Sequence, residues 1–249
     1  MDFSGKSVLI TGSSRGIGLG IAEGFARAGA DLHMLADHQQ VFGAAKALGA
    51  KAYLADITDA AKVSECLSQI SALDVLINNA GLERLTPMDD ASDEAAAIFA
   101  RILAVNVTGT YLVTRAALPK MRTGGRIIST SSVWGRVAEP FFAGYVASKH
   151  AVIGLTKCWA KELGPRGINV NAVAPGWVQT ESALRSLATM AKRSAVAEDV
   201  LLRQILDGQA LPGLMEPHDM AGVYLFLASP YAANITGQTI GADRGEAPW

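Results

Sequence analysis

Several features that mark secreted, metal-binding or membrane-spanning proteins are missing from this sequence. Its 249 residues contain only two cysteines, Cys66 and Cys158, and their positions do not match a metal-ligand motif. We therefore expect free thiols in a reducing compartment and no bound metal ion. The first residues do not place a charged segment before an apolar one, as a secretion signal does. No continuous apolar run reaches the roughly 18 residues of a membrane span, so we expect a cytoplasmic protein.

Charge is also sparse. Asp, Glu, Lys and Arg make up 18% of the residues, and the formal net charge is -1. This balance provides neither the basic surface that binds nucleic acid nor a polybasic membrane patch. Hydrophobic residues make up 50% of the chain, which is high for a soluble monomer. We expect that a large core accounts for part of this apolar content and that buried subunit faces account for the rest.

Short apolar runs alternate with longer helical stretches along the whole chain. Several runs are continuous, such as residues 8–10 and 75–77, as expected for strands covered on both faces. The predicted strands are residues 7–11, 31–36, 51–55, 73–77, 126–130, 169–173 and 238–241. The predicted helices are residues 16–28, 39–48, 59–70, 94–121, 142–163 and 217–228.

This alternation predicts an α/β fold, a Rossmann-type doubly wound parallel sheet of about seven strands with helices on both faces. No linker or composition break divides the chain, so we expect residues 1–249 to form a single domain. Residues 181–212 interrupt the alternation after a strand's carboxyl end, where ligands bind in this architecture. We expect a substrate lid there, with an ordinary surface helix pair as the alternative.

The turn after the first strand is rich in glycine. Gly12, Gly16 and Gly18 permit a tight turn and a close approach of backbone N–H groups to a pyrophosphate, next to a helix N-terminus. The intervening Ser14, Arg15 and Ile17 belong to the same predicted cofactor site. Glycines at a strand–helix turn can be purely structural, but here the strand, turn and helix follow in the order that a dinucleotide site requires.

Asp37 follows the second strand, about 20 residues past Gly18, where a carboxylate can bind ribose hydroxyls and repel a 2′-phosphate. It favours NAD over NADP. Arg15 argues the other way, because a guanidinium in the turn can bind a 2′-phosphate, although a solvent-facing role is equally plausible.

Further polar residues follow the third and fourth strands. Asp56, followed by Ile57, can accept the adenine amino group or cap a helix. After the fourth strand, Asn79, Ala80 and Gly81 can contact the cofactor, and an asparagine there can instead hold a neighbouring strand.

A tyrosine and a lysine lie one helical turn apart, Tyr145 and Lys149, with Ser132 upstream. Residues four apart share a helix face, so the ammonium can lower the phenol pKa from its ordinary value of about 10. A packed tyrosine with a solvent-reaching lysine is the alternative. Together with Ser132 and the nucleotide turn, the pair indicates a dehydrogenase.

The chain resembles the short-chain dehydrogenase/reductase family, in its branch of about 250 residues. The matching segments, in family order, are residues 11–18, 78–81, 105–109, 131–132, 145–149, 175–180 and 235–238. Where that family has a V-D-G-G stretch, this chain has Ala-Asp-Arg-Gly at 242–245 and then continues to 249. The detailed substrate class is therefore not carried over from the resemblance, and the role of residues 244–249 stays open.

The resemblance implies roles for the polar residues. Tyr145 would be the general acid/base, Lys149 would bind the nicotinamide ribose, and Ser132 would hold the substrate oxygen. Asn106 would bind a water that links Lys149 to solvent, or would be a satisfied interior amide. Residues after the sixth strand would fix the nicotinamide carboxamide, namely Pro175, Gly176, Val178 and Thr180.

A small polar substrate is expected, such as a sugar, polyol, hydroxy acid or substituted cyclic alcohol, and an anionic one stays an option. The predicted substrate-binding residues are Glu83, Ser132, Trp134, Arg136, Phe142, Tyr145, Trp177 and Arg185. Glu139 lies in the same loop as Trp134 and Arg136. The runner-up function is an NADPH-dependent carbonyl reductase, followed by a non-catalytic nucleotide-binding scaffold. The resemblance also implies a homotetramer formed through helices 94–121 and 142–163 and the last strand and helix, with a dimer as the alternative.

Overall fold

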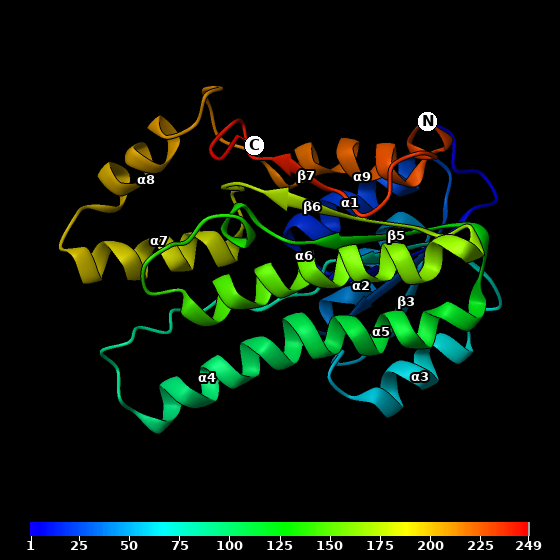
Figure 1. Ribbon diagram of the computed structural model, residues 1–249, viewed down its shortest axis with the longest axis horizontal. Coiled ribbons are helices and arrows are strands. Elements are labelled where there is room, and N and C mark those ends of the chain that lie inside the picture. The colour runs from blue at the N-terminus through cyan, green and yellow to red at the C-terminus, as the bar shows by residue number, and fades with distance from the viewer. Residues whose placement is uncertain (249) are drawn as a thin grey trace.

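The computed structural model describes residues 1–248, and its centre is one parallel sheet in the order β3-β2-β1-β4-β5-β6-β7 (Figure 1). The strands are β1 (Ser7–Thr11), β2 (Asp31–Ala36), β3 (Lys51–Leu54), β4 (Leu73–Asn78), β5 (Met121–Thr130), β6 (Asn169–Pro175) and β7 (Thr239–Ala242). The order reverses direction between β1 and β4, which places the ligand crevice at the carboxyl ends of these strands. The predicted doubly wound fold is confirmed.

Helices cover both faces of the sheet. One face carries α1 (Gly16–Arg27), α2 (Gln40–Leu48) and α9 (Ala221–Ala228), and the other carries α3 (Ala60–Ser68), α5 (Thr110–Ala117) and α6 (Ala143–Leu163). The continuous apolar run of β1 serves both layers, because Val8 and Ile10 enter the first core while Leu9 enters the second. Side chains alternate across a strand, so a strand buried on both faces needs apolar residues at every position.

The helix predicted at 94–121 differs in detail from the structure. It begins as α4 (Asp93–Leu103), widens into the π-helical segment η1 (Ala104–Gly109), continues as α5, and ends in the 3-10 turn η2 (Leu118–Lys120). A Cβ at Gly109 would lie 2.6 Å from Cγ1 of Ile57, so a glycine is needed at this close approach. The hydroxyl of Thr110 donates to the Asn106 carbonyl at 2.8 Å, which satisfies a carbonyl within the widened turn.

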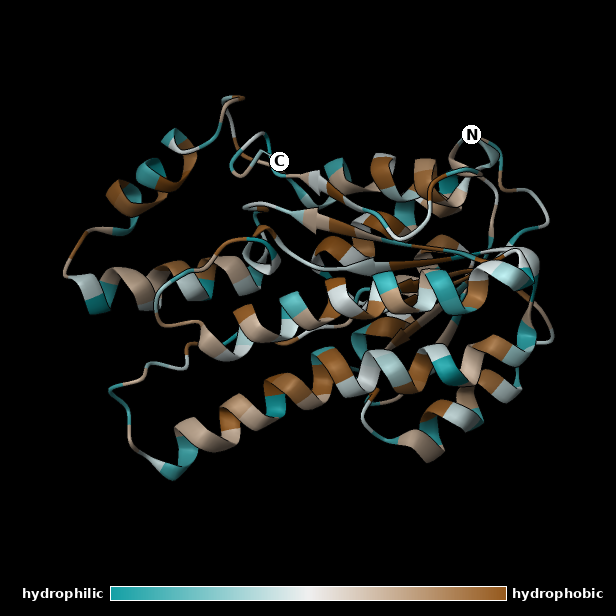
Figure 2. Cartoon of the chain, viewed as in Figure 1, coloured by the Kyte–Doolittle hydropathy of each residue, from teal (hydrophilic) through white to brown (hydrophobic). Residues whose placement is uncertain are grey.

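The combined helix Asp93–Lys120 has 28 residues and is long and apolar enough to cross a membrane, by length and composition only. The sequence contains no uninterrupted apolar run of this length, because polar residues are interspersed along the helix, so the apolar-run criterion did not identify it as a possible span. The core helix of a water-soluble protein passes the same test, and only 33% of the most apolar window is buried. Figure 2 shows apolar residues distributed along this ribbon. α4 packs against α6, and α5 packs against α3.

Residues 181–212 contain two helices, α7 (Glu181–Ser194) and α8 (Glu198–Asp207), as an amphipathic segment predicts. They project from the end of the sheet toward which the β6 and β7 arrowheads point (Figure 1). A small core of their own holds them, formed by Trp177, Ala183 and Leu187 with partly buried leucines and Ile205.

The remaining elements are short. They are the 3-10 turns η3 (Val133–Gly135), η4 (Gly164–Arg166), η5 (Pro217–Met220) and η6 (Pro230–Ala232). The helix predicted at 217–228 is therefore η5 followed by α9, and Pro217 stands in its first turn, where a helix does not use the N–H that proline lacks.

Candidate active site

Two adjoining cavities lie at the carboxyl edge of the sheet, with volumes of about 410 and 340 Å³. The larger is lined by most residues predicted to bind a dinucleotide. They are Gly12, Ser14, Arg15, Gly16, Ile17, Gly18, Asp37, Asp56, Ile57, Asn79, Ala80, Gly81, Tyr145, Lys149 and Thr180. Pro175, Gly176 and Val178 line the smaller cavity instead, which Ile17, Tyr145 and Thr180 also border.

The glycine turn has the geometry of a phosphate cradle. Gly12 and Gly16 have φ values of 65° and 54°, the left-handed conformation that glycine adopts without strain. A Cβ at Gly12 would lie 2.7 Å from Cα of Ala80, so this turn has no space for a side chain. Because its glycines carry no side chains, this turn at the N-terminus of α1 lets a pyrophosphate group approach the backbone N–H groups closely.

Asn79 fixes this turn from the neighbouring strand. Its side-chain nitrogen donates to the carbonyls of Thr11 and Gly12 at 3.2 and 3.3 Å. The Thr11 hydroxyl in turn accepts from the backbone N–H groups of Asn79 and Ala80, each at 3.0 Å. The alternative in which an asparagine holds the neighbouring strand therefore applies here, while the side chain still lines the cavity.

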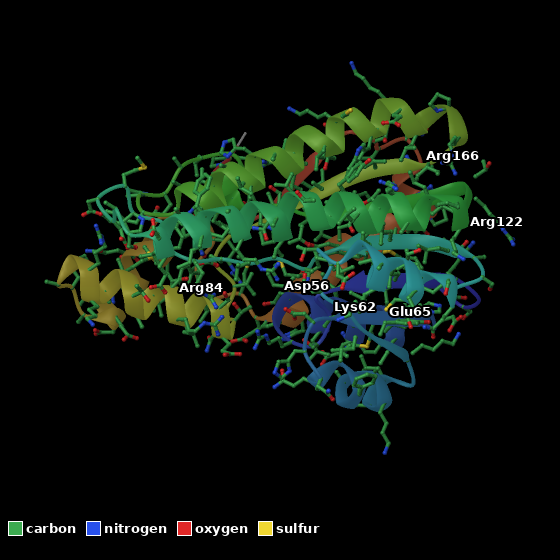
Figure 3. The ribbon with its side chains drawn as sticks, turned by 90° about the horizontal axis from the view of Figure 1, so that it is seen from below. Asp56, Lys62, Glu65, Arg84, Arg122 and Arg166 are labelled. Atoms are coloured by element: carbon green, nitrogen blue, oxygen red, sulfur yellow. The ribbon has the colours of Figure 1, made fainter. Side chains whose placement is uncertain are left out.

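Two carboxylates that follow β2 and β3 line the larger cavity. Asp37 is exposed directly after β2. Asp56, labelled in Figure 3, accepts from Thr58 and forms an ion pair with Arg101 of α4. Burial acts to raise the pKa of Asp56, but the hydrogen bonds from Thr58 and Arg101 and the Arg101 charge together lower it.

The helix cap that was the alternative role for Asp56 belongs to Asp59. Its side chain accepts from the N–H groups of Ala61 and Lys62, each at 3.1 Å. Asp56 thus has no part in capping α3 and faces the cavity with Arg101 beside it.

Tyr145 and Lys149 lie in the first turns of α6 at the boundary between the cavities. The Lys149 ammonium lies 5.4 Å from the centre of the Tyr145 ring and donates to the Thr130 carbonyl at 2.7 Å. The hydroxyl of Ser132 hydrogen-bonds the phenol. Lys149 lines the larger cavity, Ser132 the smaller, and Tyr145 both. The structure therefore brings together three of the four predicted catalytic residues where the two ligand spaces meet.

The expected lowering of the phenol pKa is wrong for this structure. Burial raises the pKa of Tyr145, the Glu83 carboxylate raises it further, and only the Ser132 hydrogen bond opposes them. Burial also lowers the pKa of Lys149 to about 8, which Glu83 partly offsets. The helical spacing alone could not predict this result, because burial depends on the segments that cover α6.

Known dehydrogenases and reductases resemble this chain over nearly its whole length. A family model described as enoyl-(acyl carrier protein) reductase matches residues 12–246. A D-beta-hydroxybutyrate dehydrogenase of Rhizobium meliloti is 32% identical over 255 residues, which span 96% of this chain and 98% of the relative. A sorbitol dehydrogenase of Cereibacter sphaeroides is 37% identical over 260 residues, 98% of each chain. A short-chain dehydrogenase/reductase of Armillaria gallica is 36% identical over 97% of this chain and 95% of its own.

The chain belongs to the short-chain dehydrogenase/reductase family. A solved structure of a proposed NAD(P)-dependent gluconate 5-dehydrogenase from Beutenbergia cavernae, with NADP bound at low occupancy, has a TM-score of 0.88 and 32% identity. The alignment covers 98% of each chain. The resemblance inferred from the sequence is thereby confirmed, as is an NAD(P)-dependent enzyme acting on CH–OH groups.

In this dehydrogenase/reductase, Asn106 lies in the π-helical segment η1 and its side chain is already bonded within the protein. Its amide nitrogen donates to the Leu82 carbonyl at 3.0 Å and to the Ser148 hydroxyl at 2.9 Å, while Oδ1 accepts from the Leu82 N–H at 2.7 Å. Of the two roles considered for Asn106, the side chain therefore has that of an interior amide whose hydrogen bonds are satisfied within the protein. The two bonds to Leu82 hold its backbone in place. The preceding residue, Gly81, lies beside Lys149, because a Cβ built on it would be 3.5 Å from the ammonium nitrogen.

The smaller cavity meets the substrate prediction in part. Glu83, Ser132, Trp134, Tyr145 and Trp177 line it. The ring centres of Trp134 and Tyr145 lie 6.1 Å apart in an edge-to-face arrangement, so an aromatic wall stands beside the phenol.

Three predicted substrate residues are placed elsewhere. Phe142 has 0% exposure and packs beneath Trp134, with 4.8 Å between ring centres. Arg136 donates to the Thr239 carbonyl of β7 and lines neither cavity. Arg185 lines the larger cavity and pairs with Glu181 at 2.6 Å. Proximity to the reacting residues in sequence does not fix the direction of a side chain. Here the Phe142 ring packs in the core, and the Arg136 guanidinium bonds a strand carbonyl.

Sequence reasoning missed several residues that line the cavities, and Arg101 and Glu246 are two of them. Arg101, which holds Asp56, lies on a helix far away in sequence, and Glu246, which lines the smaller cavity, lies in the tail whose role was left open. No local motif marks either residue. The only available signal was the departure of the tail from the family pattern.

Proposed function

We propose that the protein is an NAD-dependent dehydrogenase that oxidises the secondary alcohol of a small polar substrate to a carbonyl group. The observation that carries this proposal is the position of Tyr145, which borders both cavities, with Lys149 on one side and Ser132 on the other. Relatives named D-beta-hydroxybutyrate dehydrogenase and sorbitol dehydrogenase support a small polar substrate.

The larger cavity would hold the dinucleotide. The glycine turn, without space for a Cβ, would hold the pyrophosphate, and Asp37 would accept hydrogen bonds from the adenosine ribose. Asp56, held by Arg101, would face the adenine. Thr180, Val178 and the backbone that follows Pro175 and Gly176 would orient the nicotinamide end, which supplies the hydride acceptor when bound.

NAD is favoured over NADP because Asp37 would meet a 2′-phosphate with like charge. Arg15, which could bind a 2′-phosphate, forms an exposed ion pair with Glu181 at 3.1 Å, and such a pair opens at little cost. The NADP in the Beutenbergia cavernae structure belongs to a relative, so the preference of this chain rests on its own residues.

The proton chemistry is assigned to the residues at the boundary between the cavities. Ser132 would hold the substrate oxygen, and the ionised Tyr145 would take the alcohol proton as the C–H hydride leaves the same carbon. Lys149 would bind the nicotinamide ribose and, together with the cationic nicotinamide ring when NAD is bound, lower the phenol pKa from the value to which burial raises it. Asn106 would act through its remaining Oδ1 lone pair and main chain, on a water that connects Lys149 with solvent.

Helices α7 and α8 would act as the substrate lid. This segment contributes five residues to the lining of the smaller cavity, namely Ala183, Met190, Gln204, Ile205 and Gly208. Exposed ion pairs, such as Arg15 with Glu181 and Arg193 with Asp89, connect the lid to the rest of the protein. Such pairs are weak and can open and close at little cost.

A homotetramer is proposed, with a dimer as the alternative. Only 33% of the most apolar window of α4–α5 is buried in the single chain, and Tyr111 on α5 is 44% exposed. An apolar helix face of this kind is suited to a subunit interface. Light scattering on Tyr111→Glu tests this: a smaller assembly than wild type is expected, with Phe42→Glu on α2 as the control.

The activity itself is tested by following NADH formation with secondary alcohols, and NADPH consumption with the matching carbonyl compounds. We expect turnover of at least one small polar alcohol with NAD at higher kcat/KM than with NADP. Preference for NADPH in the carbonyl direction would support the runner-up, a carbonyl reductase. Binding of both cofactors without turnover of any alcohol or carbonyl would favour the scaffold.

A further inference from the structure

The smaller cavity carries charge of only one sign among the residues that the structure describes. Its charged lining residues are Glu83, Glu139 and Glu246, and it contains no lysine, arginine or histidine. The cavity also contains Ser132 and Tyr145, so it is the space in which the reacting group must lie. An acidic lining around a reaction site selects among substrates by charge, because burial leaves little solvent to screen repulsion.

The three carboxylates come from different parts of the chain. Glu83 follows β4, Glu139 precedes α6, and Glu246 follows β7. Folding brings all three to one cavity, and Glu139 lies close enough to Glu246 to raise its pKa. Within residues 1–248 no group of acidic and other ligand residues could hold a metal ion, so a bound cation does not account for them.

Glu246 is held in place by a structured turn. Asp243 accepts from the backbone N–H groups of Gly245 and Ala247, each at 3.1 Å, and its own carbonyl accepts from the Glu246 N–H at 3.1 Å. The Trp177 N–H hydrogen-bonds the Glu246 carboxylate. Oε2 of the same carboxylate is shielded from solvent beside the Gly176 backbone, where a Cβ would lie 2.8 Å from it.

Nearby cations do not neutralise Glu139 and Glu246. Arg185 and Arg15 pair with Glu181, and Arg244 donates to the Pro212 carbonyl at 2.6 Å. Lys149 and Arg84 act on Glu83, the carboxylate that faces both cavities. Burial raises the pKa of both Glu139 and Glu246, and the Asp243 and Glu139 carboxylates raise that of Glu246 further, as expected for carboxyl groups without a nearby cation.

Resting on the proposed dehydrogenase function, we propose that the substrate is a neutral polyhydroxylated molecule, a sugar or polyol, and that Glu139 and Glu246 accept hydrogen bonds from its hydroxyl groups. A polyol carries a donor on each carbon and can reach several acceptors at once, while its C–H faces pack on Trp134 and Trp177. A single ammonium group supplies its donors from one point. A hydroxy acid would bring its carboxylate against the two glutamates.

Ligands with the same carbon skeleton test the proposal. D-sorbitol, D-gluconate and 1-amino-1-deoxy-D-sorbitol differ only at C1, which is neutral, anionic and cationic in turn, and xylitol with xylonate gives a second pair. Binding to the NADH-loaded protein is measured by calorimetry, and kcat/KM is measured where turnover occurs. We expect sorbitol to bind at least tenfold more tightly than gluconate, and xylitol at least tenfold more tightly than xylonate. The amino polyol should bind no more tightly than sorbitol.

The variants Glu246→Gln and Glu139→Gln identify the cause. Each should reduce the preference for sorbitol over gluconate at least threefold, while Glu65→Gln on the surface of α3 leaves it unchanged. If one variant does not fold, the other still provides the test.

Tighter binding of gluconate or of the amino polyol, no binding of either neutral polyol, or an unchanged ratio in both variants overturns the proposal. Turnover of any other alcohol in those cases leaves the dehydrogenase function standing, so the two failures are distinguishable.

Discussion

The ammonium of Lys149 lies 5.4 Å from the centre of the Tyr145 ring, on the side of the larger cavity, and donates to a strand carbonyl rather than to the phenol. The pair is thus arranged around the boundary between the two cavities. Lys149 is anchored by the Thr130 carbonyl at the end of β5, so its position depends on the sheet as much as on α6. The phenol meets Ser132 on the other side.

The first prediction concerns the phenol itself. Tyr145→Phe removes the group assigned to take the alcohol proton, so we expect kcat to fall by about a thousandfold or more. The ring and its packing on Trp134 remain, so NADH binding should change less than threefold. Steady-state kinetics and a fluorescence titration measure the two effects. Tyr231→Phe, at a side chain with 80% exposure, is the matched control. Retention of most of the activity in Tyr145→Phe would falsify the assigned role.

The second prediction concerns pH. Glu83 raises the pKa of Tyr145, and alcohol oxidation needs the ionised phenol, so its rate rises with pH through that pKa. Removing the negative charge in Glu83→Gln lowers the phenol pKa, and the rising limb of the kcat/KM profile should move to lower pH. A shift of about half a unit or more is expected for a buried neighbouring charge. Glu65→Gln on the exposed face of α3 should leave the profile in place. A shift to higher pH would contradict the assigned coupling.

The third prediction concerns the choice of cofactor. Asp37→Ala removes a ribose hydrogen-bond acceptor and the repulsion of a 2′-phosphate. We expect kcat/KM with NAD to fall roughly tenfold, the equivalent of one hydrogen bond to a charged group, and kcat/KM with NADP to rise. Both values come from initial rates at varied cofactor concentration. Equal use of NAD and NADP by the wild-type protein would remove the basis for this prediction.

The fourth prediction tests the packing of the nucleotide-binding helix. A Cβ at Gly20 would overlap the Pro217 carbonyl and lie 2.8 Å from the backbone nitrogen of His218, where neither backbone atom can move easily. Gly20→Ala should therefore lower the free energy of unfolding by about 2 kcal/mol. Gly43 in α2 has no atom within 4 Å of its would-be Cβ, so Gly43→Ala should raise it by about 0.5–1 kcal/mol. Urea unfolding of both variants measures the difference.

Local sequence information predicted most of the fold. β1 and β2 have the predicted bounds, and the remaining strands differ at their ends. The largest difference is at β5, which begins at Met121 rather than at residue 126. Residues 121–125 contain Gly124 and Gly125, which lower strand propensity, so the extension depends on neighbouring strands. The π-helical widening at Asn106 had no signal in the sequence beyond an asparagine in a helix.

The candidate site divides in the same way. Sequence spacing placed the glycine turn, Asp37, Ser132, Tyr145 and Lys149, because each follows directly from a predicted strand or helix turn. It did not place Arg136 and Phe142, whose side chains point into strand and core contacts. Glu246 enters the smaller cavity through a turn at the end of the chain, which no local pattern predicts.

The sequence by itself therefore determined the architecture and the identity of the reacting groups, because hydrophobic periodicity and short spacings act within single elements. Only the tertiary structure decided the environment of those groups. Burial and the approach of Glu83 raise the phenol pKa, and carboxylates from distant segments give the smaller cavity its acidic lining. Desolvation and charge interactions depend on distances in space, and residues far apart in the chain set those distances only after it has folded.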